Sequence, residues 1–420
     1  IAFDASPRDL RASWRPVTSL ALGAVALTIA VVAVVARWLV PDMPWAGAIA
    51  LGAVVAPPDA AAATTVLKQL RPPHRLLVIV EGESLFNDAS ALLVYRLAVG
   101  AAVAGSFSGP SVLPTLLVVT VGSVVLALVL ARVTLFVSAR IHDVATAVVF
   151  QFCGTFGVWV LAEQLHLSGI ITTVVYAMAA SRRAPEILPA RIRIPAWAVW
   201  EVAVFVLNVL AFILVGFQLK SIAARVTGET GARYAVVAAA VCAAVILARI
   251  AWVAAATALA RWRARPREAA EATWRGAAVV GWCGMRGTVT LAAALALPTG
   301  GEGGAPFPYR DLILVTAFGV VLGTLVLQGL TLRPLLLRLR LEDDGSVDRE
   351  VRLARVETLR AAVAAAAECP GAGTAGLVRH RYDLELRRAE TELARDGAGA
   401  TRAAAEGEDA GSEGGVVGAA

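Results

Sequence analysis

The sequence has little charge. Charged residues make up 17% of its 420 residues, whereas soluble domains contain roughly 25%. Hydrophobic residues reach 58% before the 36 glycines are counted, against about 45–50% with glycine included in soluble domains. These proportions argue against a soluble globular enzyme.

Cysteine and histidine are also scarce, with four residues of each. The cysteines share no short spacing and three of them lie in apolar runs, so we expect neither a disulfide framework nor a metal site: Cys153, Cys242, Cys283 and Cys369. The phosphate-binding pattern Gly-x-x-x-x-Gly-Lys-Ser/Thr does not occur, which leaves an ATP-driven pump unsupported. We therefore expect no cofactor.

The charges that are present divide the chain in two. Residues 1–340 hold 28 Lys and Arg against 16 Asp and Glu, a net charge of +12. Residues 341–420 hold 10 and 16, a net charge of −6. The arginines of the first part lie in short clusters between apolar runs, which is typical of a polytopic membrane protein and not of a nucleic-acid-binding protein.

Ten apolar stretches approach the roughly 20 residues that a helix needs to span a bilayer. They run approximately over 17–40, 46–67, 76–104, 111–138, 143–164, 167–181, 195–219, 233–260, 274–298 and 309–337. The sixth is short, and the second and ninth are interrupted, at Pro57-Pro58 and at Gly284–Gly287. We predict an all-α polytopic membrane protein.

Lys and Arg concentrate in alternate loops, for example after the second, sixth and eighth stretches. Loops of this kind face the cytoplasm, so both ends of the chain are predicted to lie there. We predict a transmembrane domain over 1–340, a cytoplasmic tail of amphipathic helices over 341–400 and a disordered Gly-, Ala- and Glu-rich end over 401–420. Because the chain begins at Ile1 and not at Met, we interpret it as N-terminally truncated.

Ionisable residues inside apolar stretches indicate function, because they are costly to place in a membrane. Asp59 directly follows Pro57-Pro58, whose missing N–H groups leave carbonyls one turn earlier without partners. Free carbonyls next to one negative charge suit a dehydrating cation, and broken helices at mid-membrane are typical of secondary transporters. The alternative is a simple proline kink.

The third stretch carries Glu81, Glu83 and Asp88 within EGESLFND. At about 100° per residue, Ser84 and Asp88 share one helix face, whereas Glu83 and Asn87 share another. A single buried Asp88 that Asn87 hydrogen-bonds can trade one proton for one cation. Glu81 lies close to the basic end of the stretch, where a capping or interfacial role is the simpler interpretation.

The ninth stretch places Arg286 among Gly281, Gly284 and Gly287. Glycines at this spacing often allow only close helix packing, but packing does not explain a buried arginine. Since Glu83 is the acid left without a role, we predict a structural Glu83–Arg286 ion pair that holds two helices together.

Two stretches resemble a known family. LGAVVAPPDAAAATTVLKQLRPPHRLLVIVEGESLFNDASALLVYRLAVG is similar to the core of the electroneutral sodium/proton antiporters of the NhaP/NHE type. GMRGTVTLAAALALP resembles the Gly-x-Arg-Gly helix of that family. The similarity covers roughly residues 1–340 with the spans in the same order, and EGESLxND is its most specific motif.

The resemblance implies an inverted-repeat antiporter fold of about thirteen spans, of which about ten are present here. Spans two and nine are then the two broken helices that cross at the bilayer midplane, within a moving core of six helices. The protein is expected to be a multi-pass homodimer of the cell membrane, active in pH homeostasis.

The implied activity is one-for-one exchange of Na⁺, with Li⁺ or K⁺ as alternatives, for H⁺ by alternating access. Asp88 is expected to bind the cation or the proton in competition. Ser84, Asn87, Asp59 and the backbone of Pro58 would help to coordinate the cation, and Glu83 would pair with Arg286.

This sequence departs from the family pattern in three places. The usual Thr-Asp-Pro of the first broken helix reads Pro58-Asp59-Ala60, so a hydroxyl that often contacts the ion is lost and the ion preference is open. About three N-terminal helices, with much of the dimer surface, are expected to be missing, and Asp4 is either a remnant of an acidic ligand there or unrelated.

Other functions remain as alternatives. One is a K⁺/H⁺ exchanger of the same fold, and another is a cation channel or a sensor whose tail over 341–400 binds a ligand or partner. A third is an intramembrane aspartyl hydrolase using Asp59 and Asp88, although neither residue lies in the Tyr-Asp or Gly-x-Gly-Asp pairs of such proteases.

Overall fold

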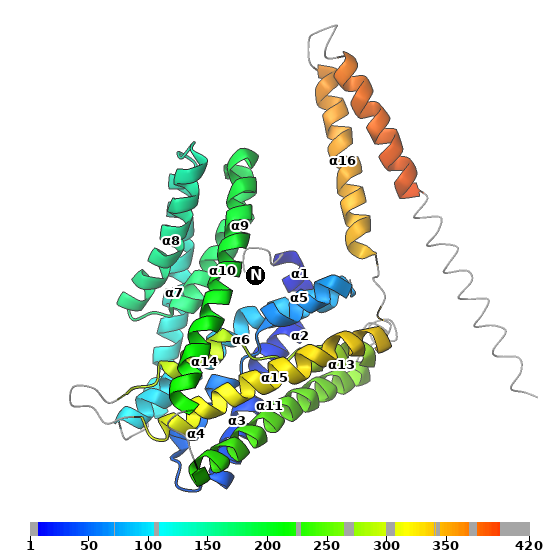
Figure 1. Cartoon of the computed structure of the whole chain (residues 1–420). Helices are drawn as coiled ribbons and strands as arrows, with labels where there is room; N and C mark the ends of the chain where they lie inside the picture. The colour runs from blue at the N-terminus through cyan, green and yellow to red at the C-terminus, as the bar shows by residue number, and fades with distance from the viewer. Residues whose placement is uncertain are drawn as a thin grey trace, which may run out of the picture. The chain divides into compact units, whose positions relative to one another are not determined.

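A computed structural model describes residues 7–70, 72–104, 109–223, 228–263, 273–299, 307–339, 341, 345–368 and 376–394. The regular structure within these ranges is helical (Figure 1). The chain divides into two units, 1–341 and 342–420. Asp4, Cys369 and the predicted disordered end over 401–420 lie outside the described residues.

Helices occupy all ten predicted spans. In order they are α2 (Trp14–Thr18) with the π-helical segment η1 (Ser19–Ala24) and α3 (Val25–Leu39); α4 (Trp45–Val55) with α5 (Ala60–Leu70); α6 (His74–Ala104); α7 (Gly109–Ser138); α8 (Val144–Gln164); α9 (Gly169–Ile187); α10 (Ala190–Ala223); α11 (Gly228–Arg263); α13 (Trp274–Trp282) with α14 (Thr288–Leu295); and α15 (Arg310–Leu339). A short helix, α1 (Pro7–Ala12), precedes them. Within the described ranges, six helices are long and apolar enough to cross a membrane.

Several helices run further than their apolar stretches. The sixth span was predicted over 167–181, but α9 continues to Ile187 through Arg182 and Arg183. A charged residue ends an apolar run without ending a helix, because its backbone still forms the i to i−4 hydrogen bond. Hydropathy therefore located the helices but not their ends.

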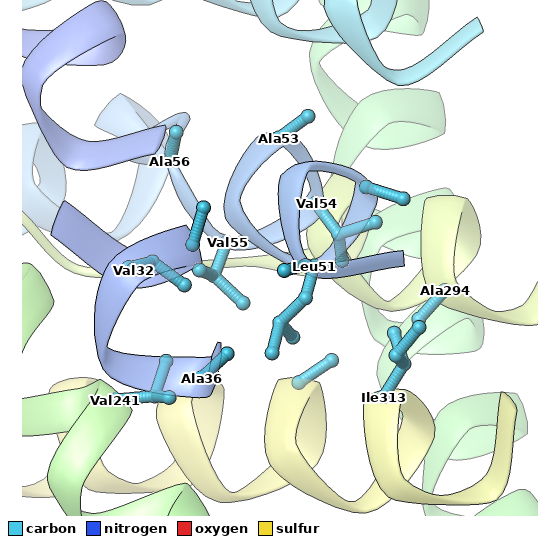
Figure 2. Packing of buried hydrophobic residues seen from close by; sticks show 14 of the residues in the cluster. Val32, Ala36, Leu51, Ala53, Val54, Val55, Ala56, Val241, Ala294 and Ile313 are labelled. Carbon is cyan, nitrogen blue, oxygen red and sulfur yellow. The ribbon is translucent and has the colours of Figure 1, made fainter. Parts of the chain in front are cut away.

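Helices α3 to α6, α11 and α13 to α15 pack together and are called the crossing bundle below. Its centre is α4, whose Leu51, Val54 and Val55 are almost inaccessible. Figure 2 shows these side chains against Val32 of α3 and Val241 of α11. A side chain at Gly52 would lie 2.8 Å from the Ile29 carbonyl oxygen, so only glycine allows α3 and α4 to approach this closely.

Helices α7 to α10 form a second group, called the flanking layer below. Helix α7 packs on α8 and α9, and α10 packs on α8 (Figure 1). The layer meets the crossing bundle where α9 contacts α6 and where α10 contacts α14 and α15. Large apolar side chains such as Trp197, Phe205 and Phe217 of α10 are exposed, as expected for a surface covered by lipid or by other helices.

The second unit consists of α16 (Ser346–Glu368) and a helix over 376–394. These two helices pack against each other through Val356, Leu359 and Ala389, and Arg360 forms an ion pair of 2.8 Å with Glu390. The amphipathic pattern of the tail thus produces a helical hairpin with a small apolar core.

Candidate ion-binding site

The two broken helices meet at their breaks. Helix α4 ends at Val55 and α5 begins at Ala60, while α13 ends at Trp282 and α14 begins at Thr288. The Asp59 backbone N–H donates to the Met285 carbonyl oxygen at 2.7 Å, which joins one break to the other. The interruptions predicted at Pro57-Pro58 and at Gly284–Gly287 are confirmed.

Asp59 is held at the start of α5. One carboxylate oxygen accepts from the Ala61 N–H at 2.9 Å, so Asp59 caps this helix. The other, Oδ2, lies directly over Gly287, in the space that the side chain of any other residue at this position would occupy. Asp59 is partly exposed.

Asn87 of α6 reaches the first break. Its Nδ2 donates to the Pro58 carbonyl oxygen at 3.1 Å, and the residue is fully buried. Its Oδ1 is buried and has no hydrogen-bond partner within the described part of the chain. A buried acceptor without a donor is costly unless a cation or a water satisfies it, so this oxygen is a candidate ligand.

Asp88 follows Asn87 and is partly exposed. Its carboxylate is close enough to that of Asp59 for the two charges to interact. Ser84 lies one helical turn earlier on the same face and is also partly exposed. The structure therefore joins Asn87 to the Pro58 carbonyl, next in sequence to Asp88 on one side and to Asp59 on the other, with Ser84 one turn before Asp88.

The predicted Glu83–Arg286 pair is wrong in its second partner. Glu83 is buried and instead accepts two hydrogen bonds from Arg249 of α11, at 2.5 and 2.8 Å. The Nη2 and Nε atoms of Arg249 also donate to the Val280 carbonyl oxygen, at 3.0 and 3.2 Å. This bidentate pair joins α6 and α11 to α13, and it leaves Arg286 to a different role.

Arg286 binds backbone carbonyls. Its Nε donates to Val55 O at 2.9 Å and its Nη2 to Ala56 O at 3.1 Å, and a third bond goes to Gly284 O. Because the prolines end α4 here, these carbonyls lack helical donors. The positive guanidinium also offsets the partial negative charge at the end of α4.

Arg249 was not identified from the sequence as the partner of Glu83, nor was Gly287 identified as the residue that the Asp59 carboxylate packs against. A signal for the first was present in the sequence, because Arg249 lies inside the eighth apolar stretch just as Arg286 lies inside the ninth, so either arginine was a possible partner for Glu83. The broken α4 also offered free carbonyls, which satisfy an arginine without a carboxylate. Nothing in the sequence alone shows that Gly287 lies against Asp59.

The arrangement separates two kinds of charged residue. Glu83, Arg249 and Arg286 are buried and fully engaged with one another or with the backbone. Asp59 and Asp88 are partly exposed, and Asn87, which precedes Asp88, has a buried amide oxygen without a partner among the described residues. A set of carboxylate, amide and carbonyl oxygens suits a hard cation.

Residues 1–338 match the family model described as "Sodium/hydrogen exchanger, transmembrane". The chain therefore belongs to the sodium/hydrogen exchanger family, whose members are transporters and not enzymes.

Two relatives and one solved structure are similar to this chain. An uncharacterised Na⁺/H⁺ exchanger of Mycobacterium tuberculosis is 33% identical over 367 residues, which cover 86% of this chain and 67% of the relative. The "Sodium, potassium, lithium and rubidium/H(+) antiporter" of Bacillus subtilis is 29% identical over 349 residues, 78% of this chain but only 51% of the relative, so the chain spans about half its length. The structure of the sodium proton antiporter MjNhaP1 from Methanocaldococcus jannaschii matches with a TM-score of 0.62 at 16% identity, over 80% of this chain and 82% of that one. The fold is thus that of an all-helical antiporter.

Proposed function

We propose that the protein exchanges one monovalent cation, most readily Na⁺, for one proton by alternating access. The observation that carries the proposal is the position of Asp88. It is partly exposed and directly follows Asn87, whose Nδ2 binds the Pro58 carbonyl at the first break and whose Oδ1 is buried without a partner in the described part of the chain. An acid in this setting binds either a proton or a cation whose hydration shell the surrounding oxygens replace.

One-for-one exchange follows because the charged and polar groups near Asp88 already have other partners or carry no charge. Glu83 is engaged by Arg249, and Asn87 is neutral. Asp59 keeps its bond to the Ala61 N–H and acts as a coordinating group. Asp88 is then the one carboxylate that changes its ligand, so a proton and a cation exclude each other and the apparent cation affinity weakens as the pH falls.

The wider architecture of the proposal rests on the family resemblance. In it the protein is a multi-pass homodimer of the cell membrane, with about thirteen spans in an inverted repeat and a cytoplasmic C-terminal tail. Alternate loops rich in Lys and Arg support this orientation, in which the His74 end of α6 faces the cytoplasm and the Ala104 end faces outward. The crossing bundle is the part that moves relative to the flanking layer.

A second candidate is K⁺/H⁺ exchange at the same site. The name of the Bacillus subtilis relative includes potassium, and Pro58 here stands where the family usually has a threonine hydroxyl. A site with one hydroxyl fewer has a different coordination shell, which favours a different balance between the two cations.

Proteoliposomes test both candidates. Purified protein is reconstituted with a pH-sensitive dye inside, and Na⁺, K⁺ and Li⁺ gradients are applied in turn, with a voltage-sensitive dye in parallel vesicles. We expect cation-driven proton flux without a membrane potential, and none in vesicles that hold Asp88→Asn. Flux that generates a potential would contradict one-for-one exchange, and the rank order of the cations decides between Na⁺ and K⁺.

A further inference from the structure

An ion pair joins the crossing bundle to the flanking layer. Arg96 of α6 donates from Nη2 to Oε1 of Glu163, near the end of α8, at 2.7 Å. The two residues are 67 positions apart in the chain. Both lie in the half of their helix that the proposed orientation turns outward.

A cavity of about 170 Å³ lies next to this pair. Ala89, Leu92 and Arg96 of α6 line one side, and His166 and Ile171 line the other. Asp88 precedes Ala89, and Leu92 and Arg96 follow it by one and two turns within an arc of about 80°, a rise of about 12 Å along the helix. The cavity therefore lies along the part of α6 that follows Asp88 outward, and Arg96, which pairs with Glu163, lines its outer part.

The Glu163 side of the pair is fixed. The same Oε1 accepts from the Gly169 N–H at 3.1 Å, at the positive N-terminus of α9. A side chain at Gly169 would lie 2.9 Å from that oxygen, so glycine keeps the contact open. His166, at φ 56°, ends α8 in the left-handed conformation, and the Leu167 N–H returns to Ala162 O at 2.9 Å.

The loop is also tied to α7, because the Ser168 N–H donates to the buried Ser123 Oγ at 3.0 Å. The Arg96 side is freer, since half of this side chain is exposed. If α6 moves, the ion pair can break while Glu163 keeps its hydrogen bond to the Gly169 N–H and the Arg96 side chain becomes solvated. Glu163 therefore stays in place, and the pair can form again when α6 returns.

We propose that Arg96 and Glu163 form the outer gate of the cation route to Asp88. Closed, the pair holds the crossing bundle against the flanking layer and excludes outside cations from the cavity; open, it admits them. This inference rests on the proposed function for its purpose but not for its geometry. A half-exposed ion pair shifts such an equilibrium only by roughly twofold to fivefold, which suits a gate that opens in every cycle.

Cross-linking tests whether the gate must open. Arg96→Cys and Glu163→Cys are combined in a chain whose native cysteines are replaced by serine and which still exchanges cations, and a short thiol-cleavable cross-linker is added. We expect exchange to be lost and to return when a reductant cleaves the link. The matched control is Gln151→Cys with Trp200→Cys, whose native side chains are 3.3 Å apart; it joins α8 to α10 within the flanking layer, away from the cavity, and leaves exchange intact. Full exchange by the cross-linked gate would overturn the proposal.

Accessibility gives a readout that needs no transport. Leu92 lines the cavity, so Leu92→Cys is labelled from outside by a membrane-impermeant thiol reagent. The labelling rate is compared in three proteins that carry this cysteine: one with native Arg96, one with Arg96→Gln and one with Arg96→Lys. We expect labelling to be roughly two to five times faster with Arg96→Gln and near the parent rate with Arg96→Lys, which keeps the charge. Equal rates in all three would refute the gate. A faster rate in a protein that exchanges no cation would refute the proposed function and leave the gate standing.

Discussion

The two helix breaks differ in the residues that make them. Pro57 and Pro58 interrupt α4–α5 by removing backbone donors, and that break ends on the acid Asp59. The break between α13 and α14 contains glycines and presents Arg286. A proline break leaves acceptors unsatisfied, whereas a glycine break leaves room for close approach.

Each break supplies hydrogen-bonding groups to the other. Arg286 donates to the carbonyls of Val55 and Ala56, and the Met285 carbonyl accepts from the Asp59 N–H. Non-helical backbone is tolerated at membrane depth only where the protein satisfies it or water reaches it, and these contacts satisfy much of it. The difference shows why the partly exposed Asp59 and Asp88 remain available for an ion, although two helices are broken beside them.

The largest expected effect is at Asp88, beside the proline break. Asp88→Asn should abolish exchange of every cation while the protein stays folded, because a neutral amide costs less to bury than a charge. Flux in proteoliposomes measures the loss of exchange, and the melting temperature in detergent shows whether the protein stays folded. Asp311→Asn, an exposed change at the start of α15, is the control and should retain flux. Flux retained in Asp88→Asn would show that another group carries the proton.

The next effect concerns the ion pair that supports the glycine break. Glu83→Gln and Arg249→Ala should each lower the free energy of unfolding by about 3–5 kcal/mol, because each leaves a buried partner unpaired. The double variant should lose less than the sum of the two. Additive losses would mean that the two side chains do not interact.

A control for this pair is the more exposed Lys68–Glu81 pair, at 3.1 Å. Because the Lys68 side chain is 62% exposed, breaking that pair should change the free energy of unfolding by no more than about 1 kcal/mol. Unfolding of the purified protein in detergent measures both pairs.

A smaller effect tests the contact between the breaks. Gly287→Ala places a methyl group where Asp59 Oδ2 now lies, so the carboxylate must move and cation affinity should fall by about tenfold. Gly157→Ala on α8, where nothing lies within 4 Å of the added carbon, is the matched control and should leave affinity unchanged. The affinity of each variant is measured as the concentration of Na⁺ that gives half-maximal flux. If this concentration is the same in Gly287→Ala as in Gly157→Ala, Asp59 does not coordinate the cation.

Replacing both Pro57 and Pro58 by Ala tests what the first break contributes. The two new N–H groups can donate one turn back, to the carbonyls of Ala53 and Val54, which would otherwise be free. We expect a severalfold weaker cation affinity and a folded protein, measured by flux and by circular dichroism. Unchanged affinity would mean that these carbonyls play no part in the site.

The smallest effect is expected at the chain's end, far in sequence from both breaks. Removal of the residues after Ala400 should leave exchange unchanged, because this Gly-, Ala- and Glu-rich segment has too little apolar surface to offset the entropy of ordering. Proteoliposome flux of the truncated and full chains makes the comparison. Loss of flux would assign the segment a role in transport.

The sequence by itself determined the helices, the two breaks and the acids beside them. Length and apolarity place a helix in a bilayer, and Pro57-Pro58 interrupts it, through local covalent chemistry that any neighbours would leave intact. The position of Asp88 on one face of α6, with Ser84 one turn earlier, likewise follows from helix geometry.

Tertiary structure alone decided which partner each charge meets. Glu83 could pair with either buried arginine, and only the packing of α11 against α13 brings Arg249 to it and leaves Arg286 to the carbonyls of α4. Arg96 and Glu163 lie in two different apolar stretches, 76–104 and 143–164, and only the contact between the two helix groups joins them. Contacts between residues 67 to 231 positions apart depend on how the helices pack, and the residue pattern of one helix does not show which other helices pack against it.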